Sequence, residues 1–237
     1  MPPLGIPTDP ESAWYFARRL IVAPTLWLAP AAAYGVDRVP AEGGAVIAAN
    51  HFSGIDHPLI GSFSPRPIRF LAKAELLEIP VLGAILRWLG VFPVRRGEGD
   101  RDALRLARQL VRDGNLVCVH IEGTRQRFGY PGPIHPGGLM IAMQEGAPII
   151  PCALDTFHWS PANRRLCAVV WGEPIDVSEL PRNRKGYAEA AEIVGAELVR
   201  LWRMAAEACA AGLPPELPDG AKRHGAFTGW SRDGVGR

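Results

Sequence analysis

Short apolar runs that alternate with helical stretches constrain the fold of this chain more than any other feature. The clearest run, 45–49, contains no polar residue. A strand with one solvated face alternates apolar and polar residues, whereas a strand buried on both faces of a parallel sheet does not. We therefore predict a buried parallel strand at 45–49, and further strands at 68–72, 91–94, 116–119, 148–154 and 166–171.

The segments between these strands carry helical signals. In 100–112, Leu104, Ala107 and Val111 fall on one side, arginines recur on another side at helical spacing, and Gly114 ends the stretch. The alternation of strand and helix predicts an α/β fold with a mostly parallel central sheet flanked by helices. Helices are predicted from residue 58 onward and at 81–89, 100–112, 138–145 and 187–211.

The length of the chain predicts one folded domain. A chain of 237 residues holds one core, since single α/β domains run to about 200–250 residues. We assign this domain to residues 35–212. The tail, 213–237, offers little to bury and is predicted to be flexible.

Residues 1–34 form a separate, N-terminal apolar segment. Its uncharged part, 20–34, has roughly 15 residues, against the ~20 needed to span a bilayer. Aromatic rings suited to lipid headgroups and the pair Arg18 and Arg19, suited to anionic phosphates, predict a helical segment that contacts the membrane interface. A helix that packs on the core and is broken by proline is the alternative. No signal peptide is recognised, so we expect a peripheral or monotopic protein on the cytoplasmic face of the cell membrane.

Charge and cysteine usage exclude several classes of partner. A net charge of +2 is too small to indicate nucleic-acid binding. The arginines gather locally instead, which favours anionic small molecules or lipid headgroups as partners. The four cysteines are widely spaced and the histidines are scattered, so buried thiols and no metal site are predicted.

The residues most suited to chemistry follow the strand at 45–49. His51 precedes Asp56 by five positions, and the two side chains meet only if the backbone turns between them, as Gly54 would permit. A carboxylate on one imidazole nitrogen leaves the other nitrogen to take a proton from a hydroxyl, which would make the pair a general base. Two structural alternatives remain: Asp56 as the cap of a helix, and His51 as a hydrogen-bonded residue at a strand end.

Four blocks in this order resemble the PlsC-type glycerolipid acyltransferases. The first block is Asn50-His51 through Asp56, and the second is Gly90-Val-Phe-Pro-Val-Arg-Arg96, with Arg95 where aspartate is common. The third is His120-Ile-Glu-Gly-Thr-Arg125, where the family usually begins with Phe-Pro, and the fourth is Pro148-Ile-Ile-Pro151. The resemblance covers residues 35 to about 174.

The resemblance implies direct acyl transfer. His51, held by Asp56, would deprotonate the acceptor hydroxyl, which then attacks a thioester with no acyl-enzyme. The chain has no Gly-x-Ser-x-Gly elbow that would favour a serine hydrolase. The second and third blocks are implied to bind the phosphate-bearing headgroup, through Arg96, Glu122, Gly123, Thr124 and Arg125. Glu122 has two open roles: acceptor for a substrate hydroxyl, or partner of Arg96 or Arg125.

The expected reaction moves a fatty acyl group from acyl-CoA or acyl-carrier protein to a lysophospholipid. The implied acceptor is 1-acylglycerol-3-phosphate, which would give phosphatidic acid, and no cofactor is expected beyond the acyl co-substrate. The departures at His120 and Ile121 leave other lipid acceptors open. A structural role is expected for His120, with a position near the site as the alternative. A catalytically inactive lipid-binding protein is the remaining alternative.

Overall fold

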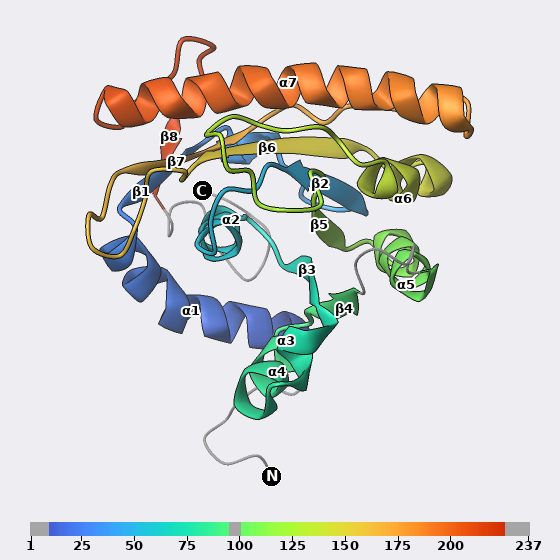
Figure 1. The fold of residues 1–237 in the computed structure, drawn as a ribbon, viewed down its shortest axis with the longest axis horizontal. Coiled ribbons are helices and arrows are strands. Elements are labelled where there is room, and N and C mark those ends of the chain that lie inside the picture. Colours follow the sequence, from blue (N-terminus) through green and yellow to red (C-terminus); the bar gives the residue numbers. More distant parts are fainter. Residues whose placement is uncertain (1–9, 95–100, 226–237) are drawn as a thin grey trace.

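The structure, a computed structural model, describes residues 10–94 and 101–225. These residues form an eight-stranded sheet with the strand order β4-β3-β5-β2-β6-β7-β1-β8 (Figure 1). The strands are β1 (Ala31–Tyr34), β2 (Ala45–Ala49), β3 (Ile68–Lys73), β4 (Phe92–Val94), β5 (Leu116–His120), β6 (Ile149–Asp155), β7 (Cys167–Trp171) and β8 (Arg223–His224).

The centre of the sheet is parallel, as predicted. Strand β2 lies between β5 and β6 and pairs in parallel with both. Strands β3 and β4 extend the parallel arrangement on one side, and β1 pairs in parallel with β7. Two antiparallel pairings, β6 with β7 and β1 with β8, were not predicted.

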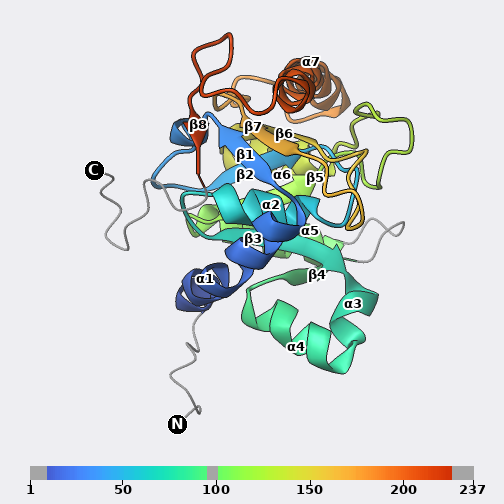
Figure 2. The same ribbon diagram turned by 90° about the vertical axis from the view of Figure 1, so that its left-hand side faces the viewer.

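Helices cover both faces of the sheet. They are α1 (Pro10–Leu28), α2 (Asp56–Phe63), α3 (Ala74–Glu78), α4 (Pro80–Trp88), α5 (Arg101–Arg112), α6 (Gly137–Glu145) and α7 (Arg184–Ala210), with a 3-10 turn at Val36–Arg38. Figure 2 shows α7 on one side of the sheet, and α1 and α2 on the other, with α3 and α4 beyond them. The strand β2 contributes Val46 and Ala48 to the core under α6 and α7, and Ala45 and Ile47 to the core under α2. A strand that packs on both faces has no side exposed to solvent, which explains the uninterrupted apolar sequence of β2.

Of the two roles predicted for the N-terminal segment, the structure shows packing on the core. Helix α1 packs Trp14 and Val22 inward and continues through Pro24, so the predicted break at proline is wrong. Arg18 is buried rather than presented to phosphates: its guanidinium donates two hydrogen bonds to the carbonyl of Ser62 (3.2 and 2.7 Å). The last residues of the segment form β1, inside the sheet.

None of the helices in the described ranges combines the length and apolar content that a membrane crossing requires.

The prediction of a flexible tail is wrong for residues 213–225. Leu217 and Ala221 are buried in the core under α7, and β8 closes the edge of the sheet beside β1. Arg38 links this segment to the domain through an ion pair with Asp219 at 3.0 Å. Residues 226–237 lie outside the described chain.

Candidate active site

The turn after β2 brings His51 and Asp56 together. His51 follows the end of the strand, Asp56 is the first residue of α2, and His51 Nδ1 lies 2.8 Å from Asp56 Oδ2. Both side chains are buried. The turn does not depend on glycine, because a Cβ atom at Gly54 would meet nothing within 4 Å.

The carboxylate of Asp56 is held from several sides. Its Oδ2 accepts the backbone N–H groups of Phe52 (2.8 Å) and Ser53 (2.9 Å), which precede the helix, so Asp56 does not act as the cap of α2. Its Oδ1 accepts the hydroxyls of Ser53 (3.2 Å) and Thr156 (2.5 Å). Burial opposes ionisation, but the hydrogen bond with His51 and the other donors outweigh it and lower the pKa of Asp56.

These contacts determine the tautomer of His51. An ionised carboxylate only accepts hydrogen bonds, so His51 Nδ1 carries the proton that it shares with Asp56. The other ring nitrogen, Nε2, then carries a lone pair. The pair therefore has the arrangement of a general base.

Thr156 is a site residue that the sequence reasoning missed. It follows the end of β6, the strand next to β2, and its buried hydroxyl reaches Asp56 across 100 positions of sequence. The carboxyl ends of neighbouring parallel strands meet at one edge of a sheet. The position of Thr156 shortly after the predicted strand at 148–154 is therefore the sequence signal that could have identified it.

Asn50, the residue before His51, links the end of β2 to β6 by two hydrogen bonds. Its side-chain amide donates to the carbonyl of Leu154 (2.9 Å), and its side-chain oxygen accepts the backbone N–H of the same residue (2.8 Å). The start of the His51 turn is thereby held to the strand that carries Thr156.

Glu122 anchors the backbone of the site. Its Oε2 accepts the N–H of His51 and its Oε1 accepts the N–H of Gly132, both at 2.6 Å. Burial raises the pKa of Glu122 to about 7, against the opposing effect of these two hydrogen bonds. Through these two contacts Glu122 joins the 121–136 loop to the His51 turn. Its predicted roles, as acceptor for a substrate hydroxyl or as partner of Arg96 or Arg125, stay predictions.

The last three residues of the third block lie on the surface beside the pair. Gly123 adopts φ +67°, and a Cβ atom there would come within 2.9 Å of the ring of His135, so the backbone needs glycine. Thr124 and Arg125 are exposed, and Gln126 donates its N–H to the carbonyl of His51 (2.8 Å). Arg96, predicted to bind the headgroup, lies outside the described residues.

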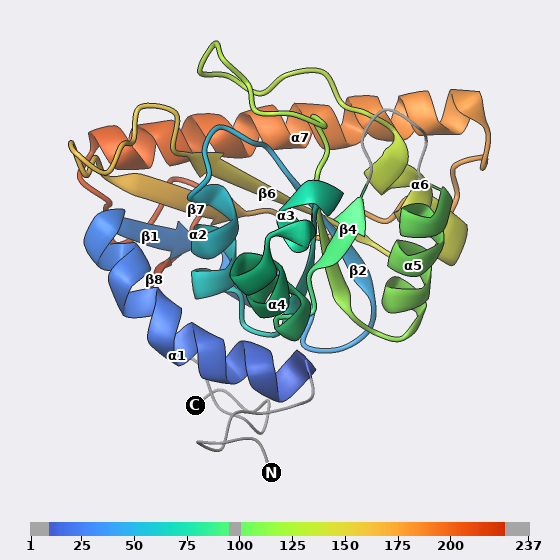
Figure 3. The same ribbon diagram turned by 60° about the horizontal axis from the view of Figure 1, so that its bottom comes forward.

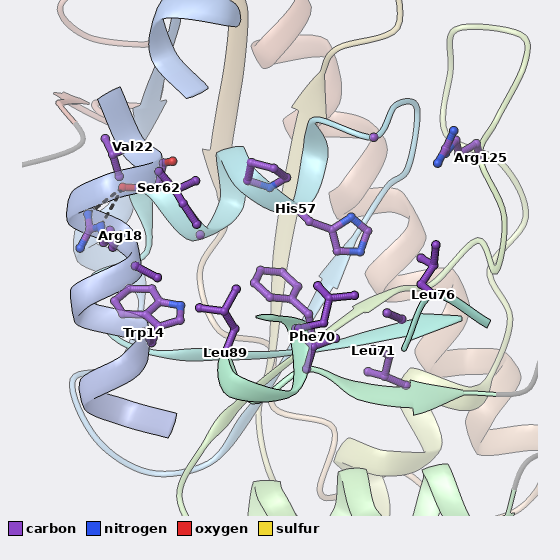
Figure 4. Close-up of a pocket in the computed structure, with 18 residues that line it drawn as sticks. Trp14, Arg18, Val22, His57, Ser62, Phe70, Leu71, Leu76, Leu89 and Arg125 are labelled. Atoms are coloured by element: carbon purple, nitrogen blue, oxygen red, sulfur yellow. Dashed lines mark hydrogen bonds between the residues drawn. The ribbon is translucent and has the colours of Figure 1, made fainter. Parts of the chain in front are cut away.

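An apolar cavity of about 350 Å³ opens next to the pair. Its walls come from α1, α2, β3 and α4, with Trp14, Phe70 and Leu89 among the lining side chains (Figure 4). Arg125 and His57 also line it, and the ring of His57 lies against that of His51, with 5.4 Å between ring centroids. The cavity is thus an apolar volume lined at one end by the guanidinium of Arg125 and the imidazole of His57, and His57 lies between it and the ring of His51.

Three histidines gather at this place, which the sequence did not predict. The ring of His120 stacks on that of His51, with centroids 4.1 Å apart, and lies 4.4 Å from that of His57. His120 Nδ1 lies 2.7 Å from the carbonyl oxygen of Asn50. Burial, followed by the neighbouring imidazoles, lowers the pKa of His120 well below its ordinary value. The alternative placement of His120, near the site, is therefore the one found.

Comparisons with known proteins agree with this geometry. A family model described as acyltransferase matches residues 31–155, more than half of the chain. The chain is 30% identical over 161 residues to a 1-acyl-sn-glycerol-3-phosphate acyltransferase of Bacillus subtilis, covering 64% of this chain and 78% of that protein. It is 35% identical over 109 residues to a lyso-ornithine lipid O-acyltransferase of Pseudomonas aeruginosa, covering 45% of this chain and 41% of that protein.

A solved structure shares the fold. The crystal structure of the 1-acyl-sn-glycerophosphate acyltransferase PlsC from Thermotoga maritima superposes with a TM-score of 0.66 at 26% identity, covering 85% of this chain and 83% of that one. The family match and the 78% coverage of the Bacillus protein decide the assignment. The chain belongs to the acyltransferase family, as a glycerolipid acyltransferase of the PlsC type.

Proposed function

We propose that the chain transfers a fatty acyl group from acyl-CoA or acyl-carrier protein to the free hydroxyl of 1-acylglycerol-3-phosphate, giving phosphatidic acid. The observation that carries this proposal is the buried His51–Asp56 pair, with Nδ1 turned to the carboxylate, beside an apolar cavity bordered by Arg125. The Bacillus relative is named for this reaction.

His51 acts as the general base in this reaction. Its Nε2 takes the proton of the acceptor hydroxyl while the oxygen attacks the thioester carbonyl, and Asp56 stabilises the imidazolium that forms. When the tetrahedral intermediate collapses, the C–S bond breaks and the imidazolium gives its proton to the departing sulfur. Atoms and charge balance without a cofactor or an acyl-enzyme.

The cavity and Arg125 bind opposite ends of the lipid substrates. An apolar cavity favours an alkyl chain, since burial is worth about 0.8 kcal/mol for each CH₂ group. Arg125 supplies a planar fork of donors suited to phosphate, and Thr124 adds a hydroxyl. Arg96 remains a predicted second cation for the same headgroup.

Exposed apolar side chains of α1 and α4 support contact with a membrane. Leu20 and Trp27 on α1 are 61% and 66% exposed, and Val81 on α4 is 73% exposed. The two helices contact each other through the rings of Phe16 and Trp88, with centroids 6.0 Å apart. We call the exposed apolar side chains of these adjoining helices the α1–α4 surface. We assign this surface to the lipid interface of the cytoplasmic face, where both substrates are accessible.

A lyso-ornithine lipid is a second candidate acceptor. The 35% identity to the Pseudomonas enzyme favours it, and so does His120 in place of the usual phenylalanine, since an imidazole nitrogen can accept a hydrogen bond from an amine. Arg125 would then meet a carboxylate in place of a phosphate.

An acyl-transfer assay tests the function. Purified protein is offered 1-acylglycerol-3-phosphate, other lysophospholipids and lyso-ornithine lipid, with acyl-CoA and acyl-carrier protein as donors. We expect transfer to 1-acylglycerol-3-phosphate, and a fall of about 10²- to 10⁴-fold in His51→Ala, the usual contribution of a positioned base. Preference for lyso-ornithine lipid would select the second acceptor, and full activity of His51→Ala would refute the mechanism.

A further inference from the structure

We infer that His51, His57 and His120 form a binding site for a divalent transition-metal ion such as Zn²⁺, and that the bound ion inhibits the enzyme. One ring nitrogen from each residue can be chosen such that all three lie within 4.8 Å of one another. The three residues come from two places in the chain: the turn and first helical residues after β2, and the end of β5.

The outer contacts of two rings are those typical of metal-binding histidines. Such histidines usually donate one ring N–H to a carboxylate or a backbone carbonyl, which orients the other nitrogen toward the metal. His51 Nδ1 pairs with the carboxylate of Asp56 (2.8 Å), and His120 Nδ1 pairs with the carbonyl of Asn50 (2.7 Å). A carbonyl oxygen accepts only, so the proton of neutral His120 lies on Nδ1 and its Nε2 carries a lone pair.

That lone pair accepts no hydrogen bond within the described part of the protein. His120 Nε2 is buried and makes no hydrogen bond there. A buried polar atom without a partner costs about 1–3 kcal/mol, and a ligand bound to this nitrogen would remove that cost. The Nε2 of His51, whose ring centroid lies 4.1 Å from that of His120, presents a second lone pair, because Asp56 occupies its Nδ1.

The donor set selects the class of ion. Neutral imidazole suits Zn²⁺, Co²⁺, Ni²⁺ and Cu²⁺, whereas Mg²⁺ and Ca²⁺ prefer oxygen ligands. The nearby carboxylates of Asp56 and Glu122 already accept hydrogen bonds on both oxygens. Three protein ligands would leave one coordination position for water.

Binding requires a modest movement of the rings. Nitrogens around a tetrahedral zinc ion lie roughly 3.4 Å apart, given a Zn–N distance of about 2.1 Å. The planes of His51 and His120 are only 19° from parallel, so one ring must tilt for the lone pairs to converge. His57 is partly exposed and lines the cavity, which gives its ring room to turn inward (Figure 4).

Inhibition follows from the identity of one ligand. A metal on His51 Nε2 occupies the atom that would take the proton from the acceptor hydroxyl. This part of the inference rests on the proposed function, whereas metal binding itself does not.

The test measures binding directly, by calorimetric titration of untagged, metal-free protein with Zn²⁺ and by the visible absorption of Co²⁺. We expect one ion per chain, no competition from Mg²⁺, and an affinity at least about 100-fold lower in His120→Phe and in His57→Gln. His158→Gln, an exposed histidine outside the cluster, is the matched control and should bind like the original protein. The four cysteines are buried and do not compete.

Two results would overturn the site: no stoichiometric binding by the original protein, or binding that both His120→Phe and His57→Gln retain. In the transfer assay, Zn²⁺ should inhibit the original protein, a chelator should restore it, and His120→Phe should resist inhibition relative to its own metal-free rate. Stoichiometric binding that leaves transfer unaffected would overturn the inhibitory role alone. Binding without transfer to any acceptor would instead count against the proposed function.

Discussion

The two faces of the sheet are covered to very different degrees. Under α5, α6 and α7, large side chains such as Leu198 and Leu201 are fully enclosed. On the opposite side lie α2 and, outside it, α1 and α4 (Figure 3). The side chains of Leu20, Trp27 and Val81 on these two outer helices are exposed to solvent. The first face is built for stability, whereas the second presents apolar surface around the cavity and the active-site turn. A protein keeps such exposed apolar surface where it binds something.

Truncation of a buried side chain of α7 should have the largest effect, on the free energy of unfolding. Leu201→Ala removes a fully buried side chain and should lower the free energy of unfolding by about 2–5 kcal/mol. Ile193→Ala, on the solvent side of the same helix, is the matched control and should change it by less than about 1 kcal/mol. Denaturant unfolding followed by circular dichroism measures both, and equal losses would contradict the contrast between the two sides of α7.

At the edge of the sheet where the parallel strands end, loss of the Thr156 hydroxyl should reduce turnover. Thr156→Val removes a hydrogen bond to Asp56 and should lower kcat by about 10- to 100-fold, the equivalent of about 1.5–3 kcal/mol for a bond to a charged group. KM should change little, and Thr156→Ser should recover most of the rate. Steady-state kinetics would contradict a positioning role if Thr156→Ser were as slow as Thr156→Val.

On the open face, a polar side chain should weaken membrane binding without unfolding the protein. Val81→Ser removes about 1.5 kcal/mol of apolar transfer energy and should reduce vesicle affinity by about tenfold. Leu106→Ser, an exposed position on α5, provides the control and should bind vesicles like the original protein. Equal losses in a sedimentation assay would show that the two faces do not differ in lipid contact.

The smallest effect should come from the ion pairs between α5 and α6, on the side of the sheet that α7 covers. Burial opposes ionisation of Glu145, but the hydrogen bonds and charges of Arg108 and Arg112 outweigh it and lower its pKa. A lowered pKa in the folded state adds stability at pH values above the ordinary carboxyl pKa, and that stability is lost as the pH falls through the folded value. Glu145→Gln should therefore cost about 1 kcal/mol or less at pH 7, and less near pH 3. Thermal unfolding at both pH values measures this, and a cost that grows toward low pH would contradict the sign.

Local patterns predicted most of the elements. The strands and the helices between them follow from short apolar runs and helical spacing, because these depend only on neighbouring residues. Strand β1 and the edge strand β8 escaped prediction: β1 is an alanine-rich stretch adjoining a helix, and β8 has two polar residues whose pairing with β1 depends on the whole sheet.

The sequence by itself determined the parallel core and placed a histidine and an aspartate where one turn could join them. Only the tertiary structure decided what surrounds that pair. The order of the sheet, with β2 between β5 and β6, brings His120 onto one side of the turn and Thr156 onto the other. The cavity likewise needs α1, β3 and α4 together. The physical reason is that residue spacing dictates local backbone geometry, whereas contacts across 70 or 100 positions depend on how the strands assemble.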